Sequence, residues 1–332
     1  GWYSGHLNQQ TYHANWGDFI SFSSRLRDIA NANGQDLLLV DTGDRHDGNG
    51  FSDITSPNGK VSLPIFLQQD YDLVTIGNHE LYELENSKLE YDWVVSRYGE
   101  SYVSSNVEYR LENGTFVPFG RKFRYFTTKN KGLRVLSFAF LFDFDRFNNG
   151  TLVIPLKVAL KQAWFKKAIS EHPESDVDVL VVFGHIPVAR SWEELQHLHR
   201  VLRKHYPNTK IQYFGGHSHI RDYTVFDANA TGLQSGRFCE TVGWASLSLS
   251  KTVDNTNGDI FEQAKETFHR SYIDFNLDSF YHHSKAQNPQ DFETTLGLNV
   301  TRDIFHLRKK LGLQKTLGNV SRLNYYVSYV PV

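Results

Sequence analysis

The chain has 332 residues, of which 40% are hydrophobic and 14% aromatic, enough for a sizeable core and, at ~150 residues per domain, for about two domains. Its 35 basic and 37 acidic residues give a net charge of −2, so the charge balance gives no indication of binding to a nucleic-acid polymer or an anionic membrane. No apolar run approaches the ~20 residues that a membrane-spanning helix needs.

The first half of the chain alternates helical and strand patterns. Residues 21–34 (SFSSRLRDIANANG) have helical spacing, with Gly34 placed to end the helix, and residues 36–44 (DLLLVDTGD) follow as a buried strand. A strand that ends in glycine recurs at 71–80 (YDLVTIGNHE), and 133–142 (LRVLSFAFLF) is a further apolar run. This alternation predicts an α/β fold with a mixed or parallel sheet and helices outside it.

The same alternation continues through the middle of the chain. Residues 176–187 (DVDVLVVFGHIP) predict a strand that stops at its glycine. Residues 191–207 (SWEELQHLHRVLRKHYP) predict a helix with Ser191 as the N-cap and Glu194 three residues later. A strand at 211–216 (IQYFGG) follows directly, so strand and helix again occur in turn.

The pattern changes after Gly243, where the sequence becomes more polar. Residues 268–281 (FHRSYIDFNLDSFY) predict a last strand, and residues 282–295 (HHSKAQNPQDFETT) are typical of a linker. Residues 301–312 (TRDIFHLRKKLG) predict a helix that Thr301 caps. We therefore expect the compact α/β unit to end before this region.

Four of the predicted strands end in a glycine that is followed within two residues by Asp, Asn or His. The four clusters are GDRHDG (43–48), GNHE (77–80), GH (184–185) and GHSH (216–219). In an α/β sheet such strand ends gather at one edge, where ligands bind. Turn capping is the usual role of Asp and Asn beside glycine, but it explains one loop and not four. The only cysteine, Cys239, excludes a thiolate cluster, so a metal site here must use His, Asp and Asn.

The four clusters, in this order, resemble four of the five signature motifs of the calcineurin-like metallophosphoesterases: D-x-H, G-D-x-x-x-G, G-N-H-[DE], G-H and G-H-x-H. This resemblance implies a four-layer α/β/β/α sandwich with mixed sheets. It also implies two divalent metal ions, with Zn, Mn, Mg and Fe left open, and attack of a metal-bridging hydroxide at phosphorus. The sequence thus predicts a metal-dependent phosphoesterase.

The resemblance also implies a role for each polar residue of the clusters. Asp44 would bridge the two metals, because a shared carboxylate offsets the repulsion between them. His79 would be a catalytic residue and not a ligand, placed to stabilise the phosphoryl oxygen or to protonate the leaving alkoxide. The implied metal ligands, together, are Asp44, Asn78, His185, His217 and His219.

The surroundings of these residues are less clearly indicated. His46 and Asp47, within GDRHDG, either surround the ligands without binding a metal or are extra ligands, and the first is the more frequent case. In bacterial relatives an Asp three residues after the catalytic histidine orients it, but Tyr82 occupies that position here. We therefore expect His79 to be oriented either by Glu83 or by no obvious partner.

A closer resemblance to the 5′-nucleotidase branch, and to those of yeasts in particular, is carried by 102–109 (YVSSNVEY), 213–222 (YFGGHSHIRD) and 232–247 (GLQSGRFCETVGWASL). It implies nucleoside 5′-monophosphates as substrates. Two alternatives stay open: a phosphodiesterase or nucleotide diphosphatase on the same fold, and a non-catalytic scaffold with a decayed site.

The same resemblance implies a division of the chain into two parts. We expect a catalytic domain over residues 1–280, and over 281–332 a linker and the start of a C-terminal nucleotidase-type domain. Gly1 corresponds to the glycine after the D-x-H motif, so the two ligands of that motif are expected outside these residues.

Asparagine-linked glycosylation sequons give an indication of the cellular location. Five N-x-S/T sequons slightly favour a secretory route (vacuole, periplasm or outside the cell) and a glycoprotein, although a cytoplasmic location stays open. They lie at Asn113, Asn149, Asn229, Asn299 and Asn319.

Overall fold

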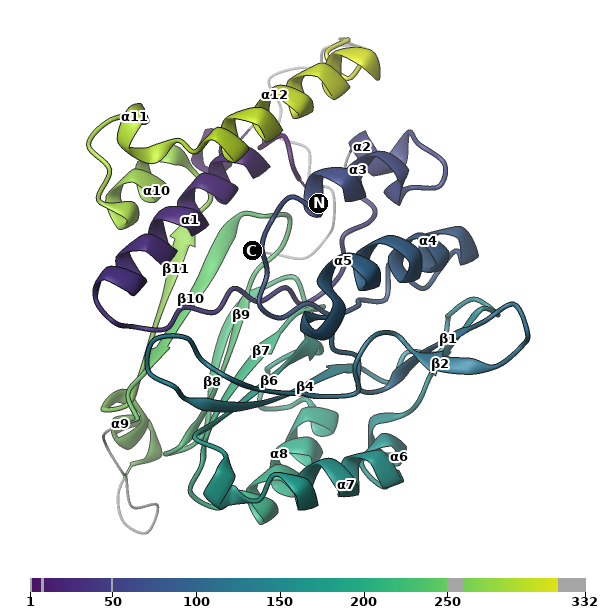
Figure 1. The fold of residues 1–332 in the computed structure, drawn as a ribbon, viewed down its shortest axis with the longest axis vertical. Helices are drawn as coiled ribbons and strands as arrows, with labels where there is room; N and C mark the ends of the chain where they lie inside the picture. Colours follow the sequence, from purple (N-terminus) through teal and green to yellow (C-terminus); the bar gives the residue numbers. More distant parts are fainter. Residues whose placement is uncertain (1, 7–8, 49, 250–258, 316–332) are drawn as a thin grey trace.

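The computed structural model describes residues 2–6, 9–48, 50–249 and 259–315 (Figure 1). Its α-helices are α1 (Trp16–Ala32), α2 (Gly50–Asp53), α3 (Gly59–Phe66), α4 (Leu84–Leu89), α5 (Ser96–Tyr98), α6 (Leu156–Ala159), α7 (Ala163–Glu171), α8 (Glu193–His205), α9 (Ile260–Lys265), α10 (Leu277–Ser284), α11 (Pro289–Phe292) and α12 (Thr295–Lys310).

The described strands form three sheets. The six-stranded sheet has the order β3 (Arg124–Thr127), β4 (Arg134–Leu141), β6 (Val179–His185), β7 (Lys210–Gly215), β9 (Ala230–Ser235) and β8 (Arg221–Asp227). Its central strands β4, β6, β7 and β9 are parallel, and the edge strands β3 and β8 are antiparallel to their neighbours. The smaller sheets are β2–β1–β5 and β10–β11, made of β1 (Val107–Arg110), β2 (Phe116–Pro118), β5 (Thr151–Val153), β10 (Thr241–Leu247) and β11 (Phe268–Asp274).

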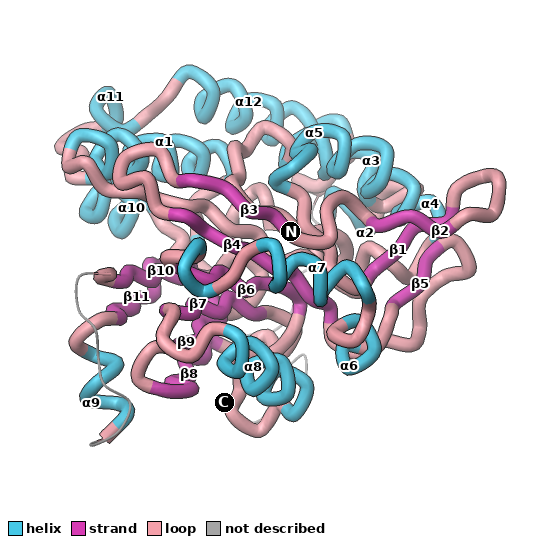
Figure 2. The backbone as a smooth tube through the Cα atoms, turned by 60° about the horizontal axis from the view of Figure 1, so that its bottom comes forward, coloured by secondary structure: helices cyan, strands magenta, loops and turns pink. Residues whose placement is uncertain are grey.

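These elements stack in four layers, which Figures 1 and 2 show from two directions. Helices α6–α8 cover one face of the six-stranded sheet, where Phe138 of β4 and Leu180 of β6 enter their hydrophobic cluster. The alternate residues Val135 and Val179 face the opposite way, into a cluster with Leu73. Strands buried on both faces need apolar side chains at successive positions, which explains the apolar runs in the sequence. The α/β/β/α arrangement is the predicted fold.

The second β layer is the part of the fold that departs from the predicted strands. The segments 36–44 and 71–80, predicted as strands, are extended chain. An isolated parallel bridge pairs Val40 with Leu73, and a second one pairs Val74 with Tyr102 in the next extended segment. The ladder is interrupted because the N–H of Leu39 donates to the side chain of Asp72 (2.7 Å) and not to a backbone carbonyl. The chain direction was therefore predicted correctly, but a continuous strand was not formed.

Two predicted helix starts are wrong. Helix α8 begins after Trp192, whose side chain makes no capping bond, so Ser191 is not the N-cap. The last helix, α12, begins six residues before Thr301, and its N-cap is Thr294, whose hydroxyl accepts from the N–H of Gly297 (3.1 Å). Thr301 instead donates to the cap residue Asn15 of α1 (2.9 Å), because the two helices pack against each other.

The region predicted as a linker is folded onto the rest of the molecule. Its residues form the end of α10 and all of α11, and Phe280, Phe292, Val300 and Ile304 join the same hydrophobic cluster as α1. Figure 1 shows α10, α11 and α12 against α1. The division at residue 280 stays a prediction, and residues 316–332 lie outside the described part of the chain.

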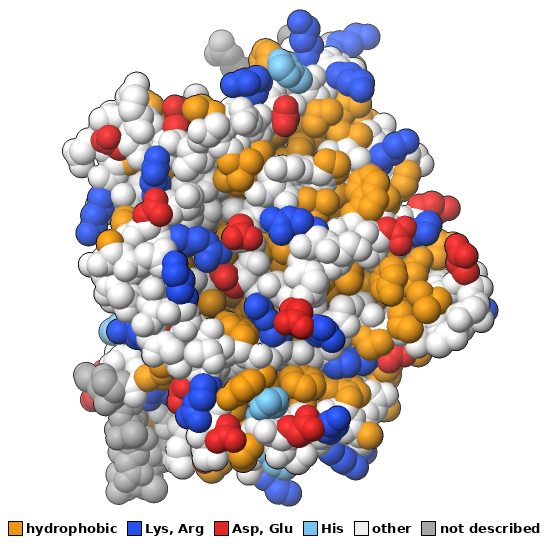
Figure 3. Space-filling model, in the orientation of Figure 1, with side chains coloured by type: hydrophobic (Ala, Val, Ile, Leu, Met, Phe, Trp, Pro, Cys, Tyr) orange, Lys and Arg blue, Asp and Glu red, His pale blue; other side chains and the backbone are white. Residues whose placement is uncertain are grey.

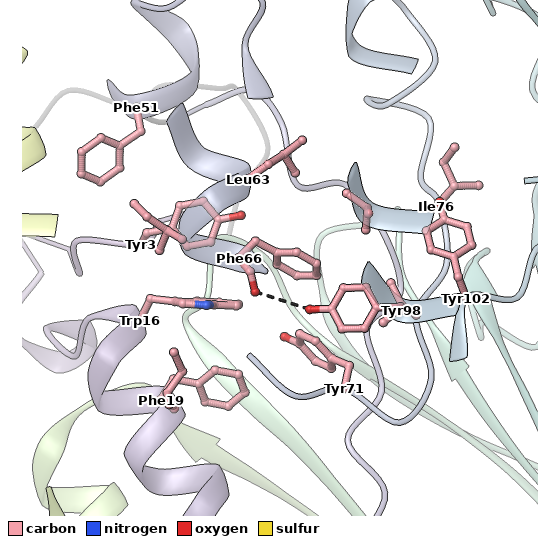
Figure 4. Close-up of a cluster of buried hydrophobic side chains, with 14 of the residues drawn as sticks. Tyr3, Trp16, Phe19, Phe51, Leu63, Phe66, Tyr71, Ile76, Tyr98 and Tyr102 are labelled. Atoms are coloured by element: carbon pink, nitrogen blue, oxygen red, sulfur yellow. Dashed lines mark hydrogen bonds between the residues drawn. The ribbon is translucent and has the colours of Figure 1, made fainter. Parts of the chain in front are cut away.

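An aromatic cluster connects α1 to the second β layer (Figure 4). Trp16 and Phe19 of α1 lie beside Phe66 of α3 and Tyr71, all of them buried. The rings of Phe66 and Tyr71 are stacked at 5.4 Å, and the hydroxyl of Tyr98 donates to the carbonyl of Phe66 (3.5 Å). Burial of rings of this size stabilises a fold by about 1.5–3 kcal/mol each, so this cluster stabilises the packing of α1 and α3 against the second β layer.

Candidate metal centre and its cavity

The predicted site residues lie around one cavity of about 390 Å³ where the two β layers meet at their strand ends. β6 ends at His185 and β7 ends just before His217, as the sequence predicted. His219 lies in the same loop as His217, whereas His79 and the Asp44 carboxylate come from the loops after the extended segments of the second layer. Seven of the predicted residues line the cavity, and Asn78 and Glu83 are not among its lining residues. The seven are Asp44, His46, Asp47, His79, His185, His217 and His219.

Two loops of the site touch each other through their glycines. A Cβ atom on Gly77 would lie 2.2 Å from the Asp44 carboxylate, and one on Gly43 would lie 2.3 Å from the Gly77 nitrogen, so neither position accepts a side chain. Glu80, which is fully buried, joins the same loops: its carboxylate accepts from the N–H groups of Asp44 (2.9 Å), Arg45 (2.5 Å) and Gly77 (2.7 Å). Glu80 therefore holds the two ligand-bearing loops in one arrangement.

Asp44 and His185 form the closest pair of predicted ligands. His185 Nδ1 donates to the carbonyl of Thr42 (3.0 Å), which leaves Nε2 directed at the Asp44 carboxylate, 2.8 Å away. Burial alone would raise the pKa of Asp44, but the neighbouring His185 and His79 hold it below its ordinary value. Burial likewise would lower the pKa of His185, and the Asp44 carboxylate raises it. A carboxylate and an imidazole nitrogen held this way form a ligand pair when the imidazole is neutral.

Asn78 presents an oxygen with no partner. The side chain is buried, its Oδ1 accepts no hydrogen bond within the described part of the structure, and its Nδ2 donates to the hydroxyl of Tyr82 (3.0 Å). An unpaired buried amide oxygen costs free energy, and this oxygen is of a type that can bind a cation. Tyr82 thereby holds the amide of Asn78 in one orientation.

The two histidines of the GHSH loop are held differently. The His217 ring stacks on Phe142 (4.0 Å between centroids), and burial lowers its pKa to about 4, so it is neutral and able to bind a metal near pH 7. His219 is exposed, and partial burial lowers its pKa. Between them, Ser218 accepts a hydrogen bond from Gln234 of β9 (2.5 Å), which anchors the loop to the sheet.

His79 has a partner that the sequence did not predict. Its Nδ1 lies 2.5 Å from Oδ2 of Asp47, while its Nε2 lies 3.9 Å from the Asp44 carboxylate. Glu83, the partner expected from the sequence, is instead exposed at the start of α4. This expectation was wrong because the loop after His79 turns the Glu83 side chain to solvent, whereas the preceding GDRHDG loop passes beside the ring.

The remaining polar residues of the GDRHDG loop are buried around the site. His46 is 3% exposed, lines the cavity, and neither of its ring nitrogens has a hydrogen-bond partner in the described structure. Arg45 pairs with Asp41 (2.6 Å) and with Glu90 (2.7 Å). These contacts place Asp41 in the support of the loop, and they leave His46 facing the cavity.

The backbone at the site adopts a conformation that most residues avoid. Asp44, Asp47, His217 and His219 all have φ between 63° and 76°. For residues other than glycine this left-handed conformation costs of order 1–3 kcal/mol and persists only where surrounding contacts enforce it. Its concentration in the predicted ligand loops is typical of a functional site.

The cavity continues from the site into the second β layer. There it runs between the extended segment 37–41 and β10, with Trp16 and Phe19 on one side and Leu233 on the other. The backbone of Leu39 bonds to Leu73 and Asp72, whereas the backbone groups of Leu38 and Val40 form no hydrogen bond among the described residues. Among the described strands, β10 pairs with β11 and with no other strand. Two strand edges thus face each other across this part of the cavity.

The donor atoms fit a divalent metal site of mixed nitrogen and oxygen ligands. Within the described ranges, no group of three or more His, Cys, Asp or Glu side chains could hold a metal by itself. The predicted set also includes the amide of Asn78, whose free oxygen, the Asp44 carboxylate and the imidazoles of His185 and His217 are ligands of the kind that Zn²⁺, Mn²⁺ and Fe²⁺ accept.

Comparison with known proteins identifies the family. The family of calcineurin-like phosphoesterases matches residues 6–221, well over half of the chain, and the chain belongs to this family. The crystal structure of 5′-nucleotidase from Candida albicans is 55% identical and superposes with a TM-score of 0.92, over 99% of this chain and 59% of that one.

The names of other similar proteins say less about function. An uncharacterized protein of Saccharomyces cerevisiae is 43% identical over 100% of this chain and 55% of its own length. A protein of Arthroderma benhamiae named as a secreted protein is 40% identical over 100% of this chain and 54% of its own length. The chain therefore spans about half the length of the curated relatives it matches. The NAD nucleotidase of Haemophilus influenzae, at 11% identity and a TM-score of 0.54, shares the fold (90% of this chain and 61% of that one).

Three residues important to the site were not predicted from the sequence: Glu80, Tyr82 as a partner of Asn78, and Arg45. Glu80 is part of the GNHE motif, so the motif itself was a signal. Arg45 is a buried cation beside several carboxylates, and such a cluster becomes visible only when the loops are folded together.

Proposed function

We propose that this chain is the catalytic part of a phosphomonoesterase that hydrolyses nucleoside 5′-monophosphates with two divalent metal ions. The observation that carries the proposal is the meeting of Asp44, His185 and His217 at one cavity, in a chain 55% identical to a 5′-nucleotidase. Such ions supply an activated water and neutralise charge on the phosphate. Asp44, Asn78, His185 and His217 would hold them, with His219 at the second ion.

Different residues of the protein would contact the phosphate and hold the metal-ligand loops in place. His79, beside the ligands but bonded to Asp47, would donate from Nε2 to a phosphoryl oxygen or to the leaving alkoxide. Glu80 would keep the ligand loops in place. The arrangement that favours hydrolysis is therefore built before substrate arrives.

We propose a position for the metal ligands that a D-x-H motif would supply. A further strand would fit the cavity between the edge of Leu38 and Val40 and the free edge of β10. Its end would reach Asp44 and the unpaired imidazole of His46. We propose that the motif lies on such a strand and supplies the remaining ligands. The complete protein should then hold two metal ions per chain, and a content of one or none would contradict this.

The proposal predicts that substitutions of Asp44 and His79 have different effects on metal content and activity in the complete protein. Asp44→Asn should lower metal content and hydrolysis of AMP together, because the bridging charge is lost. His79→Ala should lower kcat on AMP by ~10²–10⁴-fold with metal content intact, because such a group acts as acid or oxyanion donor. Metal content is measured by atomic emission and kcat by released phosphate.

Matched variants and substrates complete the test. Asp145→Asn and His306→Ala change exposed residues that are not among those lining the cavity, and they should leave both readouts unchanged. Faster hydrolysis of bis(p-nitrophenyl) phosphate than of AMP would favour a phosphodiesterase instead. A metal-free complete protein with no activity would favour a non-catalytic scaffold.

We also propose passage through the secretory route. The relative named as a secreted protein supports it, as do exposed sequons at Asn113, Asn149 and Asn299. Asn229 is 3% exposed and cannot carry a glycan in the folded chain, and Asn319 lies outside the described residues. No described helix is long and apolar enough to span a membrane. On the face in Figure 3, Lys and Arg alternate with Asp and Glu, which suits a small-molecule substrate better than a nucleic-acid polymer.

A further inference from the structure

The loop between β9 and β10 brings an arginine to the open rim of the cavity. Arg237 and Phe238 both line the cavity, and both side chains are exposed. The guanidinium of Arg237 lies over the Phe238 ring, 4.9 Å from its centroid. The centroid of the same ring lies 5.6 Å from that of His219, a predicted metal ligand. A positive charge is thus held beside the place where the proposed function puts the phosphate.

The guanidinium of Arg237 is available to a ligand. Two arginines are among the described lining residues of the cavity, and the other one, Arg45, is buried and paired with Asp41 and Glu90. Arg237 is 47% exposed, reaches the carboxylate of Glu240 only at 3.8 Å, and donates no side-chain hydrogen bond among the described residues. Its planar fork of N–H groups therefore remains free to bind an anion.

A comparable arginine elsewhere in the chain is used differently. Arg97 is 45% exposed and also lies over the ring that follows it in the sequence, that of Tyr98 (5.3 Å). Its Nε, however, donates to the carbonyl of Leu67 (3.2 Å), and it does not line the cavity. Exposure and ring stacking are thus common to both arginines, and the place beside the site distinguishes Arg237.

The backbone of the loop holds the two side chains at the rim. Phe238 and Cys239 have φ of 53° and 55°, a left-handed conformation that costs of order 1–3 kcal/mol for each such residue. His6 Nε2 donates to the carbonyl of Phe238 (2.7 Å), and the Trp2 ring lies 5.4 Å from the Phe238 ring. These contacts enforce the conformation, and strain that is maintained in this way is typical of ligand-binding loops.

We propose that Arg237 binds the phosphate of the substrate and distinguishes phosphomonoesters from phosphodiesters. A monoester carries a second negative charge near pH 7 and an additional non-bridging oxygen, which a diester replaces with a second alkoxy group. Arg237 would donate to this oxygen through its fork of N–H groups, a geometry that suits phosphate. The proposal rests on the proposed function, in which the metal ions hold the phosphate beside His219.

The test compares Arg237→Ala with the matched control Arg97→Ala in the complete, metal-loaded protein. Arg237→Ala should lower kcat/KM on AMP by ~10–100-fold, because a hydrogen bond between two charged groups is lost. Hydrolysis of bis(p-nitrophenyl) phosphate should change by less than about threefold, since the diester lacks the oxygen that Arg237 would bind. Arg237→Lys keeps the charge without the fork and should lose less than Arg237→Ala. Arg97→Ala should leave both substrates unaffected.

A second readout does not depend on turnover. Binding of inorganic phosphate to the metal-loaded protein, measured by calorimetry, should weaken ~10–100-fold in Arg237→Ala and stay unchanged in Arg97→Ala. Metal content should be the same in both variants and the parent protein, because neither arginine is a predicted ligand.

The outcomes separate this proposal from the proposed function. If Arg237→Ala behaves like Arg97→Ala on AMP and in phosphate binding, Arg237 does not bind the substrate. Equal losses on AMP and on the diester would overturn the discrimination, and loss of metal from Arg237→Ala would show that the residue acts through the ligand loops instead. A parent protein that does not hydrolyse AMP would contradict the proposed function, and phosphate binding would then still decide whether Arg237 holds a phosphate.

Discussion

Removal of the negative charge of Glu80 should both destabilise the protein and weaken metal binding at the proposed site. Glu80→Gln keeps the shape of a fully buried side chain that accepts three backbone N–H groups at 2.5–2.9 Å. A hydrogen bond to a charged group contributes about 1.5–3 kcal/mol and a neutral one about 0.5–1.5 kcal/mol. An amide oxygen can replace only one carboxylate oxygen, so at least one buried N–H also loses its acceptor.

The expected loss follows from these contacts. Two weakened bonds cost about 1 kcal/mol each, and one unsatisfied buried donor adds about 1–3 kcal/mol. We therefore expect the free energy of unfolding to fall by about 3 kcal/mol or more. This is a large share of the roughly 5–15 kcal/mol that is typical of a folded domain. Metal affinity should fall as well, because Asp44 and Gly77 lose their common anchor.

Urea unfolding of the metal-free proteins measures the first effect, and competition with a chelator measures the second. Glu83→Gln is the matched control: it makes the same chemical change three residues away at an exposed position, and should stay within about 0.5 kcal/mol of the parent protein. If Glu80→Gln unfolds within about 1 kcal/mol of the parent, below the cost of even one buried unsatisfied donor, then the carboxylate does not hold the two loops.

Two further predictions concern a ligand and a distant ion pair. Tyr82→Phe removes the hydroxyl that accepts from the Asn78 amide (3.0 Å) and should weaken metal binding ~10–100-fold in a chelator competition. Tyr91→Phe is the control and should leave metal affinity unchanged. Equal metal affinities of the two variants would refute the role of Tyr82. Asp227 accepts from Arg203 (2.8 Å) and lies 3.1 Å from His199, far from the site. Burial would raise the pKa of Asp227, but His199 and Arg203 hold it below its ordinary value. Because its folded pKa is below its unfolded value of about 3.9, its stabilising contribution is present above that pH and disappears as the pH falls further. Asp227→Asn should thus cost about 1–3 kcal/mol in urea unfolding near pH 7 and progressively less towards pH 3, whereas parallel pH curves would contradict this.

The sequence by itself determined the fold class and indicated which loops form the candidate site. Apolar runs such as 133–142 predicted central strands, since a strand covered on both faces must be apolar at every position. Glycine followed by Asp, Asn or His marked the strand ends, and the order of these clusters indicated the family before any contact was known. These signals are local, so they survive without knowledge of the packing.

Helix ends and regular pairing were less predictable. Ser191 and Thr301 have the right chemistry for N-caps, but α8 and α12 begin elsewhere because packing against α6 and α1 selects the helix that forms. The second β layer was read as strands, yet the Asp72 carboxylate replaces a backbone acceptor in it. Local propensity is a weak preference that tertiary contacts override.

The partners of the site residues were decided only by the tertiary structure. Asp47 and Glu83 were both within a few positions of a predicted ligand or catalyst, and sequence distance alone favoured Glu83 as the neighbour of His79. The folded loops place Asp47 at the ring instead, assign Tyr82 to Asn78, and bury Glu80 between two ligand loops. A hydrogen bond depends on the direction of two side chains to within tenths of an ångström, and that direction is set by backbone conformations and packing of residues far apart in the chain.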